Sequence, residues 1–157
     1  MSEVELLLVE NSDKCTVYTI QFISDDESEF EKFVSKFRME SELNQDFRAI
    51  MRFVEQIIEN GALERYFRRE GKMNDSVVAL PVLKSKLRLY CLRLSDRILI
   101  LGNGDIKQSR TYQENDTLQG YVITLQKFEL LLKQEQRCGN IEITEKEIIT
   151  NDKTFEI

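Results

Sequence analysis

Residues 86–107, KLRLYCLRLSDRILILGNGDIK, constrain the fold more strongly than any other stretch of this chain. Two runs of apolar and β-branched residues, 87–94 and 98–101, flank a Ser-Asp-Arg turn, which is the pattern of a β-hairpin. The Gly-Asn-Gly-Asp that follows the second run is typical of another turn. The chain must therefore build a sheet around a hairpin that is also basic. The cations of this hairpin are Lys86, Arg88, Arg93 and Arg97.

The apolar positions of the first hairpin strand alternate imperfectly. Odd positions in 87–91 are apolar and even positions in 86–90 carry cations or tyrosine, but after Cys91 the pattern swaps. We expect a β-bulge near Cys91–Leu92 that restores one apolar face and places Arg93 beside the other cations.

The rest of the chain predicts strands and helices in blocks. We expect strands at 4–9, 15–23 and 77–81, with Tyr18, Ile20 and Phe22 facing the core, and short strands in the tail. We expect helices from a Ser24–Glu27 capping box to residue 37, at about 42–60 ending at Gly61, and at about 116–136. The fold class is therefore α+β, an antiparallel sheet with a two-helix hairpin and a C-terminal helix packed on it. The expected single core contains Phe30, Phe33, Phe37, Phe47, Ile50, Val54, Leu87, Leu89, Ile98, Ile100, Leu125 and Phe128.

Charge is informative only when the chain is divided. The net charge is −6, yet residues 65–110 contain 11 Lys and Arg against 4 Asp and Glu, a net charge of +7, while the remainder carries −13. Such asymmetry points to a polyanionic partner, although a basic face that pairs with the protein's own acids is an equally good explanation.

Several function classes are excluded or disfavoured. The chain has no histidine, which removes the usual general base and most zinc sites, and it contains no phosphate-loop motif. Its three cysteines have no disulfide or metal-ligand spacing, and its apolar runs are too short to span a membrane. We expect a soluble cytoplasmic protein of one domain, residues 1–138, with an acidic β-like tail at 139–157, and with no cofactor or metal.

The order of one strand, two helices, three antiparallel strands and a last helix resembles the RelE/ParE/HigB toxin superfamily. The stretch ALPVLKSKLRLYCLRLSDRILILGNGDIKQSRTY is similar to the family pattern of a basic approach to the central strand, an Arg-bearing strand and a basic turn before the last helix. The resemblance covers about residues 15–135 and implies ribosome-dependent mRNA cleavage, in which cations stabilise the charge that develops when the 2′-OH attacks the phosphate.

The resemblance also implies roles for individual residues. Arg93, Arg110 and Tyr112 would carry the chemistry, with Arg88 or Arg93 matching the strand arginine that holds a phosphate. Their structural alternatives are that Arg93 lies over its apolar neighbours, that Arg110 pairs with Glu114 and that Tyr112 is a core residue. The RNA- or phosphate-binding residues would be Lys84, Lys86, Arg88, Arg97 and Lys107. The implied partners are RNA, the ribosome or a cognate antitoxin.

The chain departs from the family in being long and acidic. The tail could cover the basic face within the same chain, in which case its removal would strengthen RNA binding. The alternative is a catalytically silent interaction module of phage origin that keeps the fold without nuclease activity.

Overall fold

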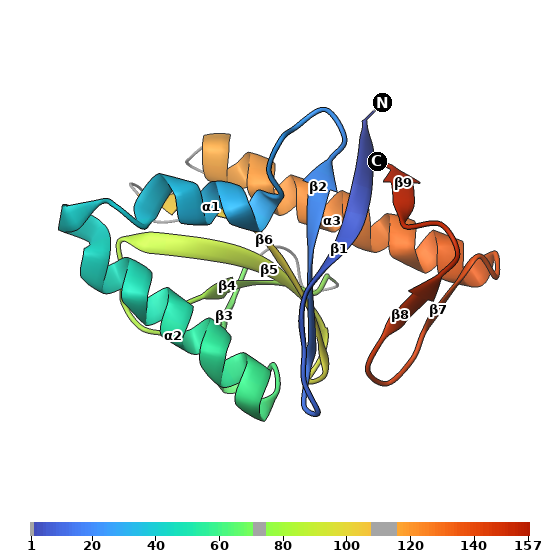
Figure 1. The fold of residues 1–157 in the computed structure, drawn as a ribbon, viewed down its shortest axis with the longest axis horizontal. Coiled ribbons are helices and arrows are strands. Elements are labelled where there is room, and N and C mark those ends of the chain that lie inside the picture. The colour runs from blue at the N-terminus through green and yellow to red at the C-terminus, as the bar shows by residue number, and fades with distance from the viewer. Residues whose placement is uncertain (1, 71–74, 108–115) are drawn as a thin grey trace.

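The computed structural model describes residues 2–70, 75–107 and 116–157. It confirms the α+β class, with three α-helices and a largely antiparallel sheet of seven strands (Figure 1). The helices are α1 (Glu29–Phe37), α2 (Asn44–Asn60) and α3 (Asp116–Arg137), with 3₁₀ turns at Ser41–Leu43 and Glu64–Tyr66. The strands are β1 (Glu3–Asn11), β2 (Thr16–Phe22), β3 (Arg68–Arg69), β4 (Val77–Leu80), β5 (Leu87–Ser95), β6 (Ile98–Ile106), β7 (Ile141–Ile143), β8 (Ile148–Thr150) and β9 (Thr154–Glu156).

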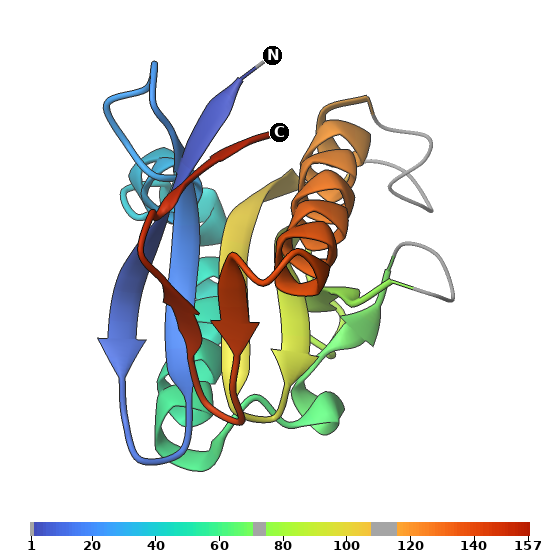
Figure 2. The ribbon, with the colours of Figure 1, turned by 90° about the vertical axis from the view of Figure 1, so that its right-hand side faces the viewer.

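The large sheet has the strand order β3-β4-β5-β6-β2-β1-β9. Its one parallel pair joins β2 to β6, and the other neighbours are antiparallel. The predicted hairpin, β5–β6, therefore lies at the centre of the sheet. Strands β3 and β9 form the two edges of this sheet. The segment after α2, which contains β3, and the C-terminal tail, which contains β9, therefore lie on opposite sides of the sheet (Figure 2).

Both faces of the sheet are covered, and the single core that the sequence predicts is in fact two. Helices α1 and α2 lie on one face, where they form the two arms of a V, and α3 lies on the other with the β7–β8 hairpin (Figures 1 and 2). On the α2 face Leu87 and Leu89 pack with the phenylalanines of α1 and α2, whereas Ile98 and Ile100 pack with α3 on the opposite face. The central strands therefore separate two apolar layers.

The prediction that Tyr18, Ile20 and Phe22 face the core is confirmed, because Tyr18 and Ile20 are buried in the α3-side core and Phe22 packs against it. The opposite face of β2 is covered as well. In β2 every residue from Thr16 to Ile20 is buried, so Tyr18 and Ile20 face α3 while Val17 faces the other helices.

In β5 the residues from Leu87 to Leu92 are all buried with regular alternation. A register shift does lie beside the predicted position, between Leu89 and Cys91, but its extra residue is in β6. The side chains of β5 therefore keep one alternation through Cys91–Leu92, and no swap of faces is needed because both faces are covered.

The Gly-Asn-Gly-Asp sequence lies within β6 and is not a turn. The register of β5 with β6 shifts opposite Tyr90, so that Gly102 and Asn103 form an irregularity in the ladder, and it shifts again between Arg93 and Ser95. A Cβ at Gly104 would lie 1.9 Å from the backbone carbonyl oxygen of Arg88. Glycine is therefore required here by the close approach of the neighbouring strand.

The helix ends follow local chemistry, with one correction. The capping box of α1 is formed by Ser28 and Glu31, four residues after the predicted Ser24–Glu27 pair. The Ser28 hydroxyl accepts from the Glu31 amide at 3.1 Å, and the Glu31 carboxylate accepts from the Ser28 amide at 2.9 Å. Helix α2 ends at Gly61, as predicted, with a positive φ of 102°.

The acidic tail belongs to the body of the protein. Strand β9 pairs with β1, and the buried residues Ile141, Ile148 and Phe155 join the α3-side core. Phe155 packs edge-on against Phe128 of α3, with ring centroids 5.6 Å apart. The tail thus lies at the β1 side of the sheet, and within the described residues its one ion pair with the basic hairpin joins Glu145 to Arg97.

Candidate functional site

The β5–β6 hairpin distributes the predicted site residues over its two ends. Arg88 and Arg93 lie five positions apart on β5, which corresponds to about 16 Å along a strand. An odd separation also places their side chains on opposite faces of the sheet. The expectation that all the cations share one surface is therefore wrong. Lys84, Lys86, Arg88 and Lys107 lie near the open end of the hairpin, and Arg93 and Arg97 lie near its turn.

Arg93 and Arg97 are held by other parts of the protein. The Nε of Arg93 donates to the carbonyl of Ala62 at 2.6 Å, and its guanidinium forms ion pairs with Asp96 and, at 3.6 Å, with Glu64. Arg97 donates to the Glu145 carboxylate at 2.6 Å and to the carbonyl of Asp13 at 3.1 Å. These contacts tie the hairpin turn to α2, to the β1–β2 turn and to the tail, which is a structural role.

Arg88 is in a different situation. It is 2% exposed, and its Nη1 donates to the carbonyls of Ser85 (2.8 Å) and Leu87 (3.0 Å). Its Nε has no hydrogen-bond acceptor within the part of the chain that the structure describes. A buried donor without a partner costs about 1–3 kcal/mol, and more when the group is charged. Arg88 is thus a buried cation with an open donor position.

Two further cations and two carboxylates, Glu70 and Asp46, surround Arg88. Arg68 of edge strand β3 and Lys107, at the end of β6, lie within electrostatic range of it, as does Glu70. Burial, reinforced by Arg68, lowers the pKa of Arg88, and burial, reinforced by Arg88 and Arg68, lowers the pKa of Lys107. We call Arg68, Arg88 and Lys107 the basic cluster. Burial and mutual repulsion disfavour the charged forms of Arg88 and Lys107. A bound anion would offset that cost, so its binding would be stabilised.

Glu70 is the carboxylate that faces the basic cluster. Burial raises the pKa of its carboxyl group even though Lys107, Arg68 and Arg88 each oppose the shift. The effect of burial outweighs that of three cations, so Glu70 is a poor counter-ion for them. The cluster with Glu70 counted keeps an excess of positive charge.

Two of the three predicted lysines, Lys84 and Lys86, precede β5 and Arg88 in the chain. Lys84 and Lys86 are exposed, and the carbonyl of Lys86 accepts from the amide of Lys107 at 2.7 Å. The amide of Lys86 donates to Asp46 at 3.0 Å, which fixes this end of the hairpin against α2. Arg110 and Tyr112 lie outside the described residues.

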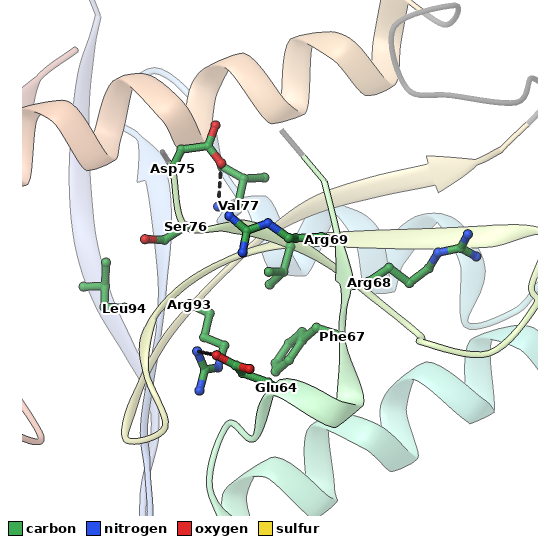
Figure 3. Close-up of a pocket in the computed structure, with 10 residues that line it drawn as sticks. Glu64, Phe67, Arg68, Arg69, Asp75, Ser76, Val77, Arg93 and Leu94 are labelled. Atoms are coloured by element: carbon green, nitrogen blue, oxygen red, sulfur yellow. Dashed lines mark hydrogen bonds and ion pairs between the residues drawn. The ribbon is translucent and has the colours of Figure 1, made fainter. Parts of the chain in front are cut away.

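Arg68 was not predicted as a site residue, although it contributed to the charge excess of residues 65–110. Its placement depends on the register of β3, in which Arg68 lies opposite Ala79 and Arg69 opposite Val78, so that the two arginines face opposite sides. Figure 3 shows Arg68 directed away from Arg69 and Arg93. No sequence pattern marks a two-residue edge strand, so only the charge count could have indicated Arg68.

A pocket of about 390 Å³ lies at the β3–β4 edge of the sheet, and Arg68 of the basic cluster lines it together with Arg69 and Arg93 (Figure 3). Glu64 and Asp75 also line it, so its charges are mixed. Arg93 already donates to Ala62, Asp96 and Glu64, which leaves this pocket less suited to a polyanion than the basic cluster.

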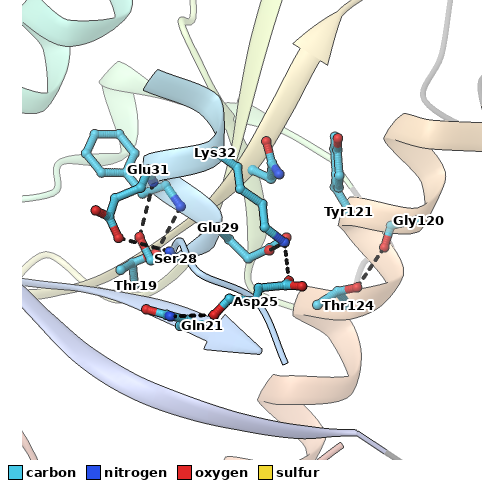
Figure 4. Close-up of polar contacts among 12 residues, drawn as sticks. Thr19, Gln21, Asp25, Ser28, Glu29, Glu31, Lys32, Gly120, Tyr121 and Thr124 are labelled. Atoms are coloured by element: carbon cyan, nitrogen blue, oxygen red, sulfur yellow. Dashed lines mark hydrogen bonds and ion pairs between the residues drawn. The ribbon is translucent and has the colours of Figure 1, made fainter. Parts of the chain in front are cut away.

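A second group of polar residues connects α1 to its surroundings (Figure 4). Lys32 pairs with Asp25 and, at 2.6 Å, with the buried Glu29. Burial alone would lower the pKa of Lys32, but the hydrogen bonds to the two carboxylates outweigh it and the pKa is raised. Lys36 donates to the carbonyl of Gly104 at 2.7 Å and to the hydroxyl of Tyr121 at 3.0 Å. These lysines are satisfied within the fold and hold α1 against β6 and α3.

The described residues include no group of acidic, cysteine or histidine side chains that could hold a metal ion, and no described helix is both long and apolar enough to cross a membrane. Comparison of the chain with protein-family models, with curated proteins and with solved structures finds no match. Its function must therefore be inferred from its own residues.

Proposed function

We propose that this chain is a RelE-like protein that binds single-stranded RNA through the basic cluster at the open end of its central hairpin. The observation that carries the proposal is the buried Arg88, which has an open Nε donor and lies within electrostatic range of Arg68 and Lys107. The chain order β2-α1-α2-β3-β4-β5-β6-α3 supports the proposal, because apart from the two-residue edge strand β3 it is the order on which the resemblance to the toxin superfamily rests.

A phosphate group suits this cluster on physical grounds. Guanidinium groups match the oxygens of phosphate with paired donors, and such charge-assisted hydrogen bonds are about twice as strong as neutral ones. The exposed Lys84 and Lys86 extend the positive surface beyond the buried anchor. A flexible single strand can present one phosphate to the buried arginine and lay its neighbours over the exposed lysines, which a rigid duplex cannot do.

Cleavage of the RNA is a separate question. Of the three residues to which the resemblance gives chemical roles, Arg93 is held by Asp96 and Glu64, and Arg110 and Tyr112 lie outside the described residues. The proposal is therefore restricted to binding. Ribosome-dependent cleavage, or recognition of a cognate antitoxin by the same face, would be an addition to it.

The rival function is that of a catalytically silent interaction module. It is favoured by Arg93 and Arg97, two cations of the basic hairpin that are already paired with the protein's own acids. If the basic cluster behaved in the same way, the chain would bind RNA weakly and without dependence on these residues.

Fluorescence anisotropy with a short labelled single-stranded RNA tests the proposal. The affinity should fall between about 50 and about 200 mM salt, with a slope of about 0.7 per phosphate engaged. Lys107→Ala should weaken binding and reduce that slope by about one phosphate's share. Lys153→Ala is the matched control, since it removes the same charge at the far side of the sheet, beside β9. Equal, salt-insensitive binding by all three proteins would refute RNA binding and leave the interaction module standing.

A further inference from the structure

The basic cluster contains its own competitor for a bound anion. Glu70 follows β3, and its amide donates to the carbonyl of Val77 at 3.3 Å, which fixes its backbone beside β4. Continuation of the β3–β4 register, in which Arg68 lies opposite Ala79 and Arg69 opposite Val78, places Glu70 beside Val77 and its side chain on the same face of the sheet as Arg68. The charged groups that face Glu70 among the described residues are Arg68 of β3, Arg88 of β5 and Lys107, which follows β6.

Glu70 is close enough to interact with all three cations, yet it completes none of their hydrogen bonds. The described structure contains no ion pair between Glu70 and a member of the cluster, and the Nε of Arg88 still lacks an acceptor. A carboxylate in this position neutralises part of the positive charge without using the available donor. The Glu70 carboxylate therefore repels a bound anion, but it does not take that anion's place on the donor of Arg88.

We propose that Arg88, Arg68 and Lys107 form a seat for one phosphodiester group of the RNA, and that Glu70 is a built-in gate that weakens this seat while it is ionised. This inference rests on the proposed function for the identity of the ligand. The gate acts by charge repulsion between the Glu70 carboxylate and the phosphate oxygens. When Glu70 takes up a proton, the repulsion ends and the three cations act on the phosphate alone.

The affinity for the phosphate should change with pH in one direction. A phosphodiester keeps its single negative charge throughout the range in which a carboxyl group titrates, so the ligand's own charge does not change. Burial raises the pKa of Glu70, so its protonation begins at a higher pH than that of an ordinary glutamate. Affinity should therefore rise as the pH falls from about 7.5 towards about 5. By linkage, a bound phosphate raises the pKa of Glu70 by the same coupling.

Glu70→Gln is the decisive variant because it removes the charge and keeps the size of the side chain. It should tighten RNA binding about fivefold or more at neutral pH, which is the lower range of typical coupling between sites, and it should abolish the pH dependence. Since burial disfavours the charge of Glu70, this variant should fold at least as well as the wild type. Glu142→Gln is the control, because Glu142 is an exposed residue of β7 and its replacement changes the net charge equally.

The experiment measures RNA affinity by anisotropy from about pH 7.5 to about pH 5 for the wild type, Glu70→Gln and Glu142→Gln. A parallel titration with sulfate, a tetrahedral anion whose charge is constant over this range, is followed by the backbone amide resonances of Arg88 and Lys107. The expected result is stronger binding of both ligands at low pH in the wild type and in Glu142→Gln, and pH-independent, tighter binding in Glu70→Gln.

The outcomes separate the two proposals. If RNA binds but Glu70→Gln neither tightens binding nor removes its pH dependence, the gate is refuted and RNA binding stands. If RNA does not bind while sulfate shifts the Arg88 and Lys107 amides with a Glu70-dependent pH profile, the seat and its gate stand and the RNA function fails. If neither ligand responds, both proposals are wrong.

Discussion

Removal of the C-terminal tail should unfold this protein, although the sequence pattern predicts that it would expose a basic face. A chain that ends at residue 138 lacks Ile141, Ile148 and Phe155, each of them 6–7% exposed and part of the α3-side core. Burying one such side chain contributes about 1.5–3 kcal/mol, so the three together contribute about 5–9 kcal/mol. The whole free energy of unfolding of a domain is typically about 5–15 kcal/mol.

Urea unfolding followed by far-ultraviolet circular dichroism measures this loss. The truncated chain should show little or no cooperative transition, and the full-length chain should show one. Because a truncated chain can fail for several reasons, Phe155→Ala provides a smaller perturbation of the same contact. It removes the ring that packs against Phe128 and should cost about 3–5 kcal/mol. Ile149→Ala, in β8 of the same tail but 49% exposed, should cost less than about 0.5 kcal/mol.

The refuting result would be a chain of residues 1–138 that unfolds at the same urea concentration as the full-length protein. That outcome would mean that the tail is a detachable cover, and the interpretation of the tail as part of the core would be wrong. Stronger RNA binding by such a stable truncated chain would support autoinhibition by the acidic tail instead.

Two further predictions test the packing of the sheet and the state of its thiols. Gly104→Ala should destabilise the protein by several kcal/mol in the same urea assay, because its Cβ would overlap the backbone of β5. Gly120→Ala should instead stabilise α3 by about 0.5–1 kcal/mol, since no atom lies within 4 Å of a Cβ at that position. Similar stability of the two variants would contradict the strand contact. In the folded protein Cys138 should react fast with a thiol reagent, since it is exposed. Cys15 and Cys91 should react only on unfolding, because burial raises the pKa of Cys15 to about 11 and also raises the pKa of Cys91. More than one fast-reacting thiol in the native state would show that the core is open.

Local signals in the sequence predicted the elements well, because their causes are local. The apolar stripe of α2, the stop at Gly61 and the β5–β6 hairpin all depend on residues within a few positions of one another. The faces of the strands were harder to predict. A strand that is half apolar suggests one solvated face, but Arg88 occupies a buried position on a sheet covered on both sides.

The candidate site was predicted in part. Lys86, Arg88 and Lys107 do lie at one end of the hairpin, as the basic pattern indicated. Arg93 and Arg97 do not join them, and the parity of Arg88 and Arg93 along β5 already separates the two unless a bulge intervenes. The partner of Arg97, Glu145, is 48 residues away in sequence, so this pairing depends on the fold and no local pattern reveals it.

The central claim is that RNA enters the seat of the buried arginine and not the turn of the hairpin. The most direct measurement is the response of the arginine Nε–H resonances to a short single-stranded RNA in a heteronuclear NMR titration. The Nε–H of Arg88 should shift strongly, because it gains an acceptor that the free protein lacks. The Nε–H of Arg93, which already donates to Ala62, should not move. A shift of Arg93 with no change at Arg88 would contradict the account.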